Sequence, residues 1–270
     1  MLFKAGIGKV ILNWLKFMST RVSNSNTSTT ANTDGSVFAF NTDTESNFFK
    51  NYRNICSLTT ESCMCLKSLC IHDDIRKEMS CAYENGKYFL NSGIAVPLLS
   101  LATAFDIVPA GIEIGASGEN ENGANPHNAI AAAALTAAKQ LITSEESVQV
   151  MAQHGAMALP LRIYTTYLNG IDAIASAEAT SGSSAVKEHV CDFGSGCDGS
   201  HDHNPTPVPD NAVSMTLLRA VTGVMRNLCA DDRRKNALAA DGTLLALMRV
   251  MSRPECLQDV SFSDNAIACL

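Results

Sequence analysis

The sequence predicts an all-α protein, an α-solenoid in which repeats of three helices wind into a right-handed superhelix. Three observations lead to this prediction. Alanine and leucine are frequent, whereas aromatic residues make up only 6% of the 270 residues, which favours helices over sheets. Two turn signals, a glycine before an apolar helix and a polar acidic turn, recur in a fixed order. Three segments rich in small polar residues divide the chain into helical blocks.

The first turn signal is a glycine that precedes an apolar helix in four blocks. The glycines are Gly6, Gly93, Gly155 and Gly242. Once the polar segments and a local extension of about ten residues in the first interval are subtracted, the intervals between them come to about 41 to 48 residues, close to the roughly 40–47 residues of helical repeats. We expect each glycine to take a left-handed conformation between two helices.

The second turn signal follows a long helix in three blocks, which read CMCLKSLCIHDDIRKE, ALTAAKQLITSEESVQV and VTGVMRNLCADDRRKNA. An acidic pair marks each turn: Asp73 and Asp74, Glu145 and Glu146, Asp231 and Asp232. Acidic side chains complement the exposed N–H groups and the dipole at a helix start. Each block therefore predicts three helices in a repeat.

At these residues the chain resembles the armadillo repeat family. The resemblance rests on HDDIRKEMSCAYENGKYFLNSG, LITSEESVQVMAQHGAMALPLRIY and LLRAVTGVMRNLCADDRRKNALAADGTLLALMRVM, and covers about two-thirds of the chain. It implies that long helices line a concave groove that grips an extended protein partner. It also implies a scaffold protein without catalytic activity.

The predicted organisation alternates repeats with insertions. In order along the chain we expect the end of a partial repeat at 1–18, a Ser/Thr/Asn-rich insertion at 19–47, a repeat at 48–105, a Gly/Asn-rich insertion at 106–126, a repeat at 127–171, a Gly/Ser/Pro/His-rich insertion at 172–212, a repeat at 213–254 and the start of a truncated repeat at 255–270.

Residues 1–18 have two interpretations. In the first they are the tail of a repeat, and we expect the chain to be a fragment cut inside a repeat at both ends, because solenoids usually finish with caps. In the second, residues 1–33 are a mitochondrial presequence, since they are basic, rich in hydroxyl groups and free of acidic residues before Asp34.

Composition narrows the class of partner. The net charge of −7 argues against nucleic acid, which needs a basic face, and no apolar run reaches the roughly 20 residues that cross a bilayer. Of ten cysteines, Cys56, Cys63 and Cys70 recur every seven residues. This spacing predicts small buried residues on one helix face and free thiols in a reducing compartment, the cytoplasm or the nucleus.

The resemblance also suggests where a partner binds. Nuclear-import receptors of this fold carry a tryptophan and an asparagine four residues apart, and the matching pairs here are Met64 and Ser68, Thr136 and Gln140, and Gly223 and Asn227. Only Asn227 matches, which argues against a basic import signal as the ligand.

The same face predicts a groove for an acidic or amide-rich segment. Its candidate residues are Lys67, Ser68, Lys139, Gln140, Arg219, Arg226 and Asn227. A plainer interpretation stays open: these are solvated side chains, with cations placed near helix C-termini where the dipole favours them.

One loop, HVCDFGSGCDGSHDH at 189–203, gathers possible zinc ligands. The weak candidates are Cys191, Cys197, His201 and His203. Their spacing lacks a close C-x2-C pair, so we expect neither a metal nor another cofactor, and a zinc-binding regulatory protein remains the alternative. No nucleophile stands out beside a base, so the sequence predicts no enzyme.

Overall fold

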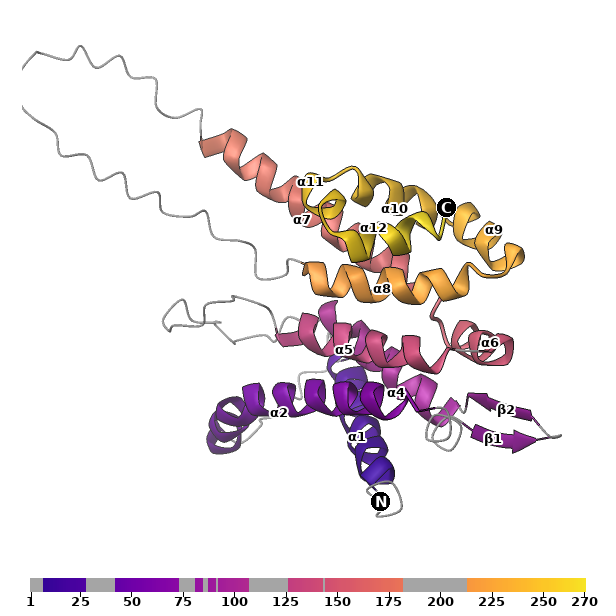
Figure 1. Cartoon of the computed structure of the whole chain (residues 1–270). Helices are drawn as coiled ribbons and strands as arrows, with labels where there is room; N and C mark the ends of the chain where they lie inside the picture. The colour runs from indigo at the N-terminus through magenta and orange to yellow at the C-terminus, as the bar shows by residue number, and fades with distance from the viewer. Residues whose placement is uncertain are drawn as a thin grey trace, which may run out of the picture.

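A computed structural model describes residues 7–27, 42–72, 81–84, 87–90, 92–106, 126–142, 144–181 and 213–270. In these ranges the chain is almost wholly helical, which confirms the all-α part of the prediction (Figure 1). The helices are α1 (Ile7–Thr27), α2 (Thr42–Leu69), α4 (Ser92–Ala102), α5 (Pro126–Leu141), α6 (Glu145–Gln153), α7 (Leu159–Ser181), α8 (Met215–Leu228), α9 (Asp232–Ala240), α10 (Thr243–Met251), α11 (Pro254–Leu257) and α12 (Val260–Ile267), with a 3₁₀ turn at Thr103–Asp106.

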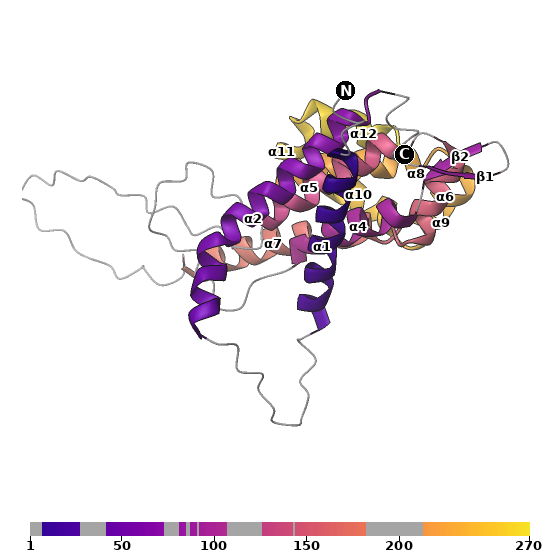
Figure 2. The ribbon, with the colours of Figure 1, turned by 90° about the horizontal axis from the view of Figure 1, so that it is seen from below.

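Four helices far apart in the sequence lie one above another. Figure 1 shows α2, α5, α8 and α12 as successive rungs, and α2 packs on α5, α5 on α8, and α8 on α12. Helix α4 packs on both α1 and α5, and α7 on both α8 and α10. Seen from below, α1 and α2 form the near end of the stack (Figure 2). The order of layers in space therefore follows the order of the chain.

Helix α5 shows why the rungs pack closely. It is enclosed by α2 and α8, and it buries almost all of its length. Its alanines at 131–134, 137 and 138 are buried, and Leu135 is fully enclosed. Alanine favours helix and lets neighbouring helices approach from two sides. The alanine-rich sequence thus fits a helix in the middle of a stack.

A buried polar contact joins α7 to α8. The hydroxyl of Tyr164 lies 2.8 Å from Oγ1 of Thr222 and 3.6 Å from Sδ of Met225. Burial raises the pKa of Tyr164, so the phenol stays neutral. A hydrogen-bonded polar pair in an apolar interior fixes one packing arrangement between the two helices.

The cysteine prediction for α2 is confirmed. Cys56, Cys63 and Cys70 are 3%, 0% and 0% exposed and are free thiols. Their seven-residue spacing places them on the face that α2 turns to the core.

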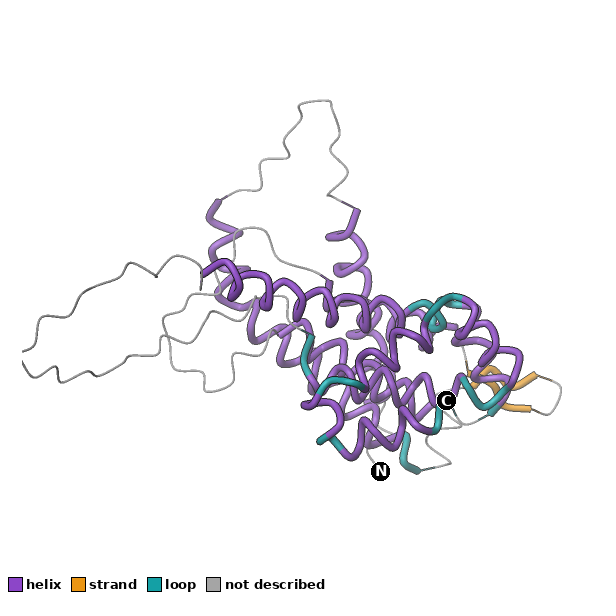
Figure 3. Tube along the Cα trace, turned by 90° about the horizontal axis from the view of Figure 1, so that it is seen from above, coloured by secondary structure: helices purple, strands orange, loops and turns teal. Residues whose placement is uncertain are grey.

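A two-stranded hairpin is the main departure from the predicted helices. The start of the helix expected after the acidic turn at Asp73 and Asp74 lies outside the described residues. Further along, where only helices were predicted, β1 (Cys81–Glu84) pairs antiparallel with β2 (Lys87–Leu90). The sequence between the strands is Asn85-Gly86, the strongest short signal for a hairpin. The hairpin lies at the edge of the helices, beside α6 (Figure 3).

The glycine prediction holds at two positions and fails at one. Gly155 and Gly242 follow the ends of α6 and α9 with φ of +94° and +87°, as expected. Gly93 instead lies in the first turn of α4 and is absent from the positive-φ glycines of the described chain. A strand precedes α4, so there is no helix end for this glycine to close. Gly6 lies outside the described residues.

The helices run further than the predicted insertion limits. Helix α1 continues to Thr27, α2 begins at Thr42 and α7 continues to Ser181, although insertions were expected at 19–47 and 172–212. Two hydroxyl groups at the start of the first of these segments bond back to their own helix. Ser19 and Thr20 both donate to the carbonyl of Lys16, at 2.9 and 3.0 Å, so these side chains are satisfied within their own helix.

The left-handed turn before α10 generates a test. Gly242→Ala should lower the free energy of unfolding by about 1–2 kcal/mol, because an L side chain strains φ of +87°. The loss is conformational, since no atom lies within 4 Å of a new Cβ.

Gly170→Ala is the matched control for this turn. Gly170 lies within α7, and a Cβ placed on it would meet no atom within 4 Å. Alanine there should raise the free energy of unfolding by about 0.4–1 kcal/mol. Urea unfolding of both variants measures the difference, and two changes of the same sign would contradict the assigned turn.

Candidate functional site

A basic residue occupies the same place in three consecutive rungs. Lys67, Lys139 and Arg226 each stand two residues before the last residue of α2, α5 and α8. We call these three residues the basic row. Because the three helices are neighbours in the stack, equivalent positions follow one another along it. Arg226 is exposed, and Lys67 and Lys139 are half-buried.

The side chain of Lys139 crosses onto the next rung at Gly223. A Cβ placed on Gly223 would lie 3.0 Å from Cδ and 3.0 Å from Nζ of Lys139. The glycine therefore leaves the space through which the lysine stem passes. Apolar methylene groups of lysine commonly cover such surface while the ammonium group stays near solvent.

Arg226 makes the corresponding contact one layer further along. Its Nη1 donates to Oδ1 of Asn265 on α12 at 3.4 Å. This contact is long and occupies one of the five N–H donors of the guanidinium. Both Lys139 and Arg226 thus reach toward the following rung.

Arg219 is engaged in a different link between α8 and α12. Its guanidinium forms an ion pair with Asp259, whose Oδ1 also accepts from the backbone N–H of Phe262 at 2.8 Å and so caps α12. The hydrogen bond from Arg219 lowers the pKa of Asp259. The structure therefore gives Arg219, a predicted groove residue, an internal partner.

Asn227 has a structural role that the sequence prediction missed. Its Nδ2 donates to the carbonyl of Ile142 at 3.3 Å and to that of Lys139 at 3.5 Å, so it closes the C-terminal end of α5. Carbonyls at a helix end lack partners within the helix. The amide of Asn227, a predicted groove residue, holds α8 against α5.

The remaining groove candidates lie near the ends of their helices. Ser68 is exposed on α2, and its hydroxyl donates to the carbonyl of Met64 at 3.0 Å. Gln140 is half-buried on α5, next to Lys139. These positions surround the basic row with polar side chains.

An ion pair between Arg234 and Glu145 joins α9 to α6. Nη1 and Nη2 of Arg234 donate to the two carboxylate oxygens of Glu145 at 2.6 and 2.9 Å, and Nε donates to the carbonyl of Leu228 at 3.1 Å. The hydrogen bond from Arg234 lowers the pKa of Glu145. The acidic turn was predicted to serve the dipole of α6, and the structure adds this contact between layers.

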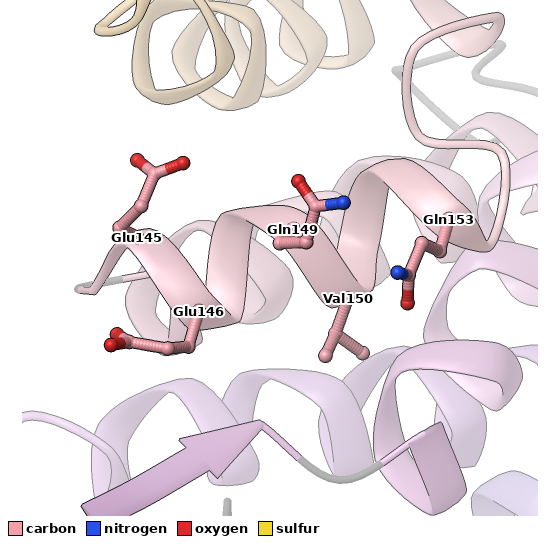
Figure 4. A pocket seen from close by; sticks show the side chains of 5 residues that line it. All are labelled: Glu145, Glu146, Gln149, Val150 and Gln153. Atoms are coloured by element: carbon pink, nitrogen blue, oxygen red, sulfur yellow. The ribbon is translucent and has the colours of Figure 1, made fainter.

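Two shallow depressions lie apart from the basic row. One, of about 410 Å³, follows α6 alone, where Glu145 points away from Glu146, Val150 and Gln153 (Figure 4). The other, of about 380 Å³, lies between α4 and the start of α7. Its lining residues are Val96, Leu99, Ser100, Thr103, His154, Gly155, Ala158, Leu159 and Arg162.

The zinc candidates Cys191, Cys197, His201 and His203 lie outside the described residues. Within the parts of the chain that are described, no three His, Cys, Asp or Glu side chains come close enough to hold a metal ion. Among those same parts, none of the helices is both long and apolar enough to span a membrane.

Comparison with known proteins found no matching family model, no matching curated protein and no matching solved structure.

The contact of Asn227 predicts a loss of stability on truncation. Asn227→Ala should lower the free energy of unfolding by about 1 kcal/mol, because two carbonyls at the end of α5 lose a donor. The control is Asn236→Ala, which also replaces asparagine by alanine but at an exposed position of α9. It measures the part of the change that comes from helix propensity alone. If both variants unfold alike in urea, the amide does not join α8 to α5.

The Arg219–Asp259 pair predicts a dependence on pH. The folded-state pKa of Asp259 is lowered, so its stabilising effect is complete above the ordinary carboxyl pKa of 3.8 and is lost as the pH falls through the lowered value. Asp259→Asn keeps a good N-cap but loses the charge. Its free energy of unfolding should therefore fall less than that of the wild type between pH 6 and about pH 3.

Asp264→Asn, an exposed carboxylate of the same helix, is the control for this experiment. Its pH profile should follow the wild type. If the free energy of unfolding of Asp259→Asn changes with pH in parallel with that of the wild type, the ion pair with Arg219 does not stabilise α12.

Proposed function

We propose that the chain is an armadillo-type solenoid that binds an extended segment of a protein partner along α2, α5 and α8, and that it has no catalysis of its own. The observation that carries this proposal is the basic row. Free buried thiols and a net charge of −7 favour a role in the cytoplasm or the nucleus and argue against nucleic acid as the partner.

The stacking supports a repeat architecture. Helices α2, α5 and α8 pack on one another in sequence, α4 packs on α5 and α7 on α8, and the short α6 and α9 follow the acidic turns. This is the order expected of three-helix repeats, and equivalent residues then recur at regular intervals along one face.

A helix dipole alone does not account for the basic row. The dipole favours a cation in the last turn, and Arg249 stands as far from the end of α10 as the three cations stand from the ends of their helices, so position alone does not mark a ligand site. Lys139 and Arg226 also extend toward the next rung. The packing of α2, α5 and α8 against one another and the shared direction of Lys139 and Arg226 favour a common ligand over three separate dipole contacts.

The row suits a partner with carboxylate or amide side chains. Packed helices lie about 8–10 Å apart, and an extended chain rises about 3.3 Å per residue. An acidic residue at every third position of the partner would then meet each cation in turn. Because each contact is exposed, it contributes little alone, and binding depends on their number.

The test uses a labelled twelve-residue peptide with glutamate at every third position, and its lysine counterpart. The wild type should bind the glutamate peptide more tightly, and Lys139→Gln with Arg226→Gln should weaken that binding about 2- to 30-fold at low salt. Asn227 is left intact because its loss would disturb α5. Fluorescence anisotropy measures the dissociation constants.

Arg249→Gln removes an exposed cation from α10 and is the matched control, which should leave binding unchanged. Equal binding of the two peptides, or equal affinity of the double variant and the wild type, would overturn the proposal.

A further inference from the structure

Two cysteines meet where α8 and α12 end. Cys229 follows the last residue of α8, and Cys269 lies in the turn after α12. They are 9% and 0% exposed, and both are free thiols. The thiol of Cys269 donates to the carbonyl of Asn265 at 3.1 Å. Because α12 packs on α8, both cysteines lie at the same contact between helices, and each shifts the pKa of the other. They come from different rungs and lie 40 positions apart in the sequence.

The preceding layer shows the same contact with other side chains. Asn227 on α8 reaches back to the carbonyl of Ile142, the residue that follows α5. If NAIACL at 265–270 is aligned with GVMRNL at 223–228, Cys269 takes the place of Asn227, and Cys229 takes the place of Ile142. Repeat geometry therefore places residue 269 beside residue 229 independently of the thiols themselves.

The contacts of the basic row support this alignment. Lys139 lies across Gly223, and in the next layer Arg226 meets Asn265. Gly223 and Asn265 are aligned with each other by the same shift. Two different contacts thus repeat from one layer to the next.

The surroundings make the two thiols unequal. The neighbouring Cys269 thiol lowers the pKa of Cys229, and the ammonium of Lys235 lowers it further against the effect of burial. The neighbouring Cys229 sulfur and burial raise the pKa of Cys269, with Arg226 and Lys235 opposing them. Cys229 is therefore the thiol that more readily becomes a nucleophilic thiolate.

We propose that Cys229 and Cys269 form a redox-responsive dithiol, which a peroxide converts to a disulfide that ties α8 to the end of α12. The inference does not depend on the proposed binding function. It makes the last rung of the stack a site of reversible covalent modification.

The reaction balances with hydrogen peroxide as oxidant. The Cys229 thiolate attacks one peroxide oxygen, the O–O bond breaks, and the leaving hydroxide takes a proton to become water, which leaves a sulfenic acid on Cys229. The Cys269 sulfur then attacks the Cys229 sulfur and expels its hydroxyl group, which leaves as water with the thiol proton. The two sulfurs lose two electrons and the peroxide gains them. A thiol reductant such as glutathione reverses the change.

Other buried cysteines of the described chain are poorer candidates. Burial raises the pKa of Cys63 to about 12, so its thiolate is scarce. Cys256 lies 3.4 Å from the hydroxyl of Tyr167, and burial raises its pKa as well. A low dose of peroxide should therefore act first on the Cys229–Cys269 pair.

The experiment treats the folded 270-residue protein with increasing hydrogen peroxide, blocks remaining thiols with N-ethylmaleimide and digests it with trypsin without reduction. The expected product joins the peptides 227–233 and 250–270, and fragmentation assigns the bond to Cys269 rather than Cys256. The intact protein should lose 2 Da. Oxidation of the protein unfolded in guanidinium should give mixed pairings.

Cys269→Ala should abolish the cross-linked peptide, whereas Cys256→Ala should retain it. The wild-type digest keeps the test valid even if a variant folds poorly. Failure of the native protein to form this cross-link before the exposed Cys65 is oxidised would overturn the proposal, as would a cross-link from Cys229 to Cys256.

Discussion

The enclosure of α5 and of α8, each between two other helices, is the constraint on which the rest of the structure depends. Helix α5 meets α2 on one side and α8 on the other, and α8 meets α5 and α12. A helix enclosed in this way needs small or apolar side chains around most of its surface, which the alanines of α5 provide. Polar side chains are then left to one exposed strip and to the helix ends.

The helix ends carry the specific links between layers. Asn227 closes the end of α5, Asp259 both caps α12 and binds Arg219, and Arg234 joins the two acidic turns. Apolar packing tolerates sliding of one helix along another, whereas a hydrogen bond to a terminal carbonyl or carboxylate fixes the register. The equivalent positions of the basic row depend on this register.

Much of the helical framework could be predicted because its signals are local. Periodic apolar residues located the helices, seven-residue spacing located the buried cysteines of α2, and glycine marked the turns at Gly155 and Gly242. The left-handed turn predicted at Gly93 was wrong, because glycine is also found in the first turn of a helix that follows a strand. The fate of Asn227 could not be predicted, since it depends on which carbonyl the neighbouring layer brings within reach. The hairpin had a local signal, Asn85-Gly86, which the repeat pattern obscured.

The layered contacts have a consequence for how the molecule responds to force and heat. In a compact globule, distant segments share one core, so local damage spreads to all of it. Here the main contacts of the described helices join consecutive layers. Damage in one layer should therefore affect mainly its neighbours, and amide hydrogens of α5, which is enclosed on two sides, should exchange most slowly. The described helices should therefore unfold layer by layer rather than in a single cooperative transition.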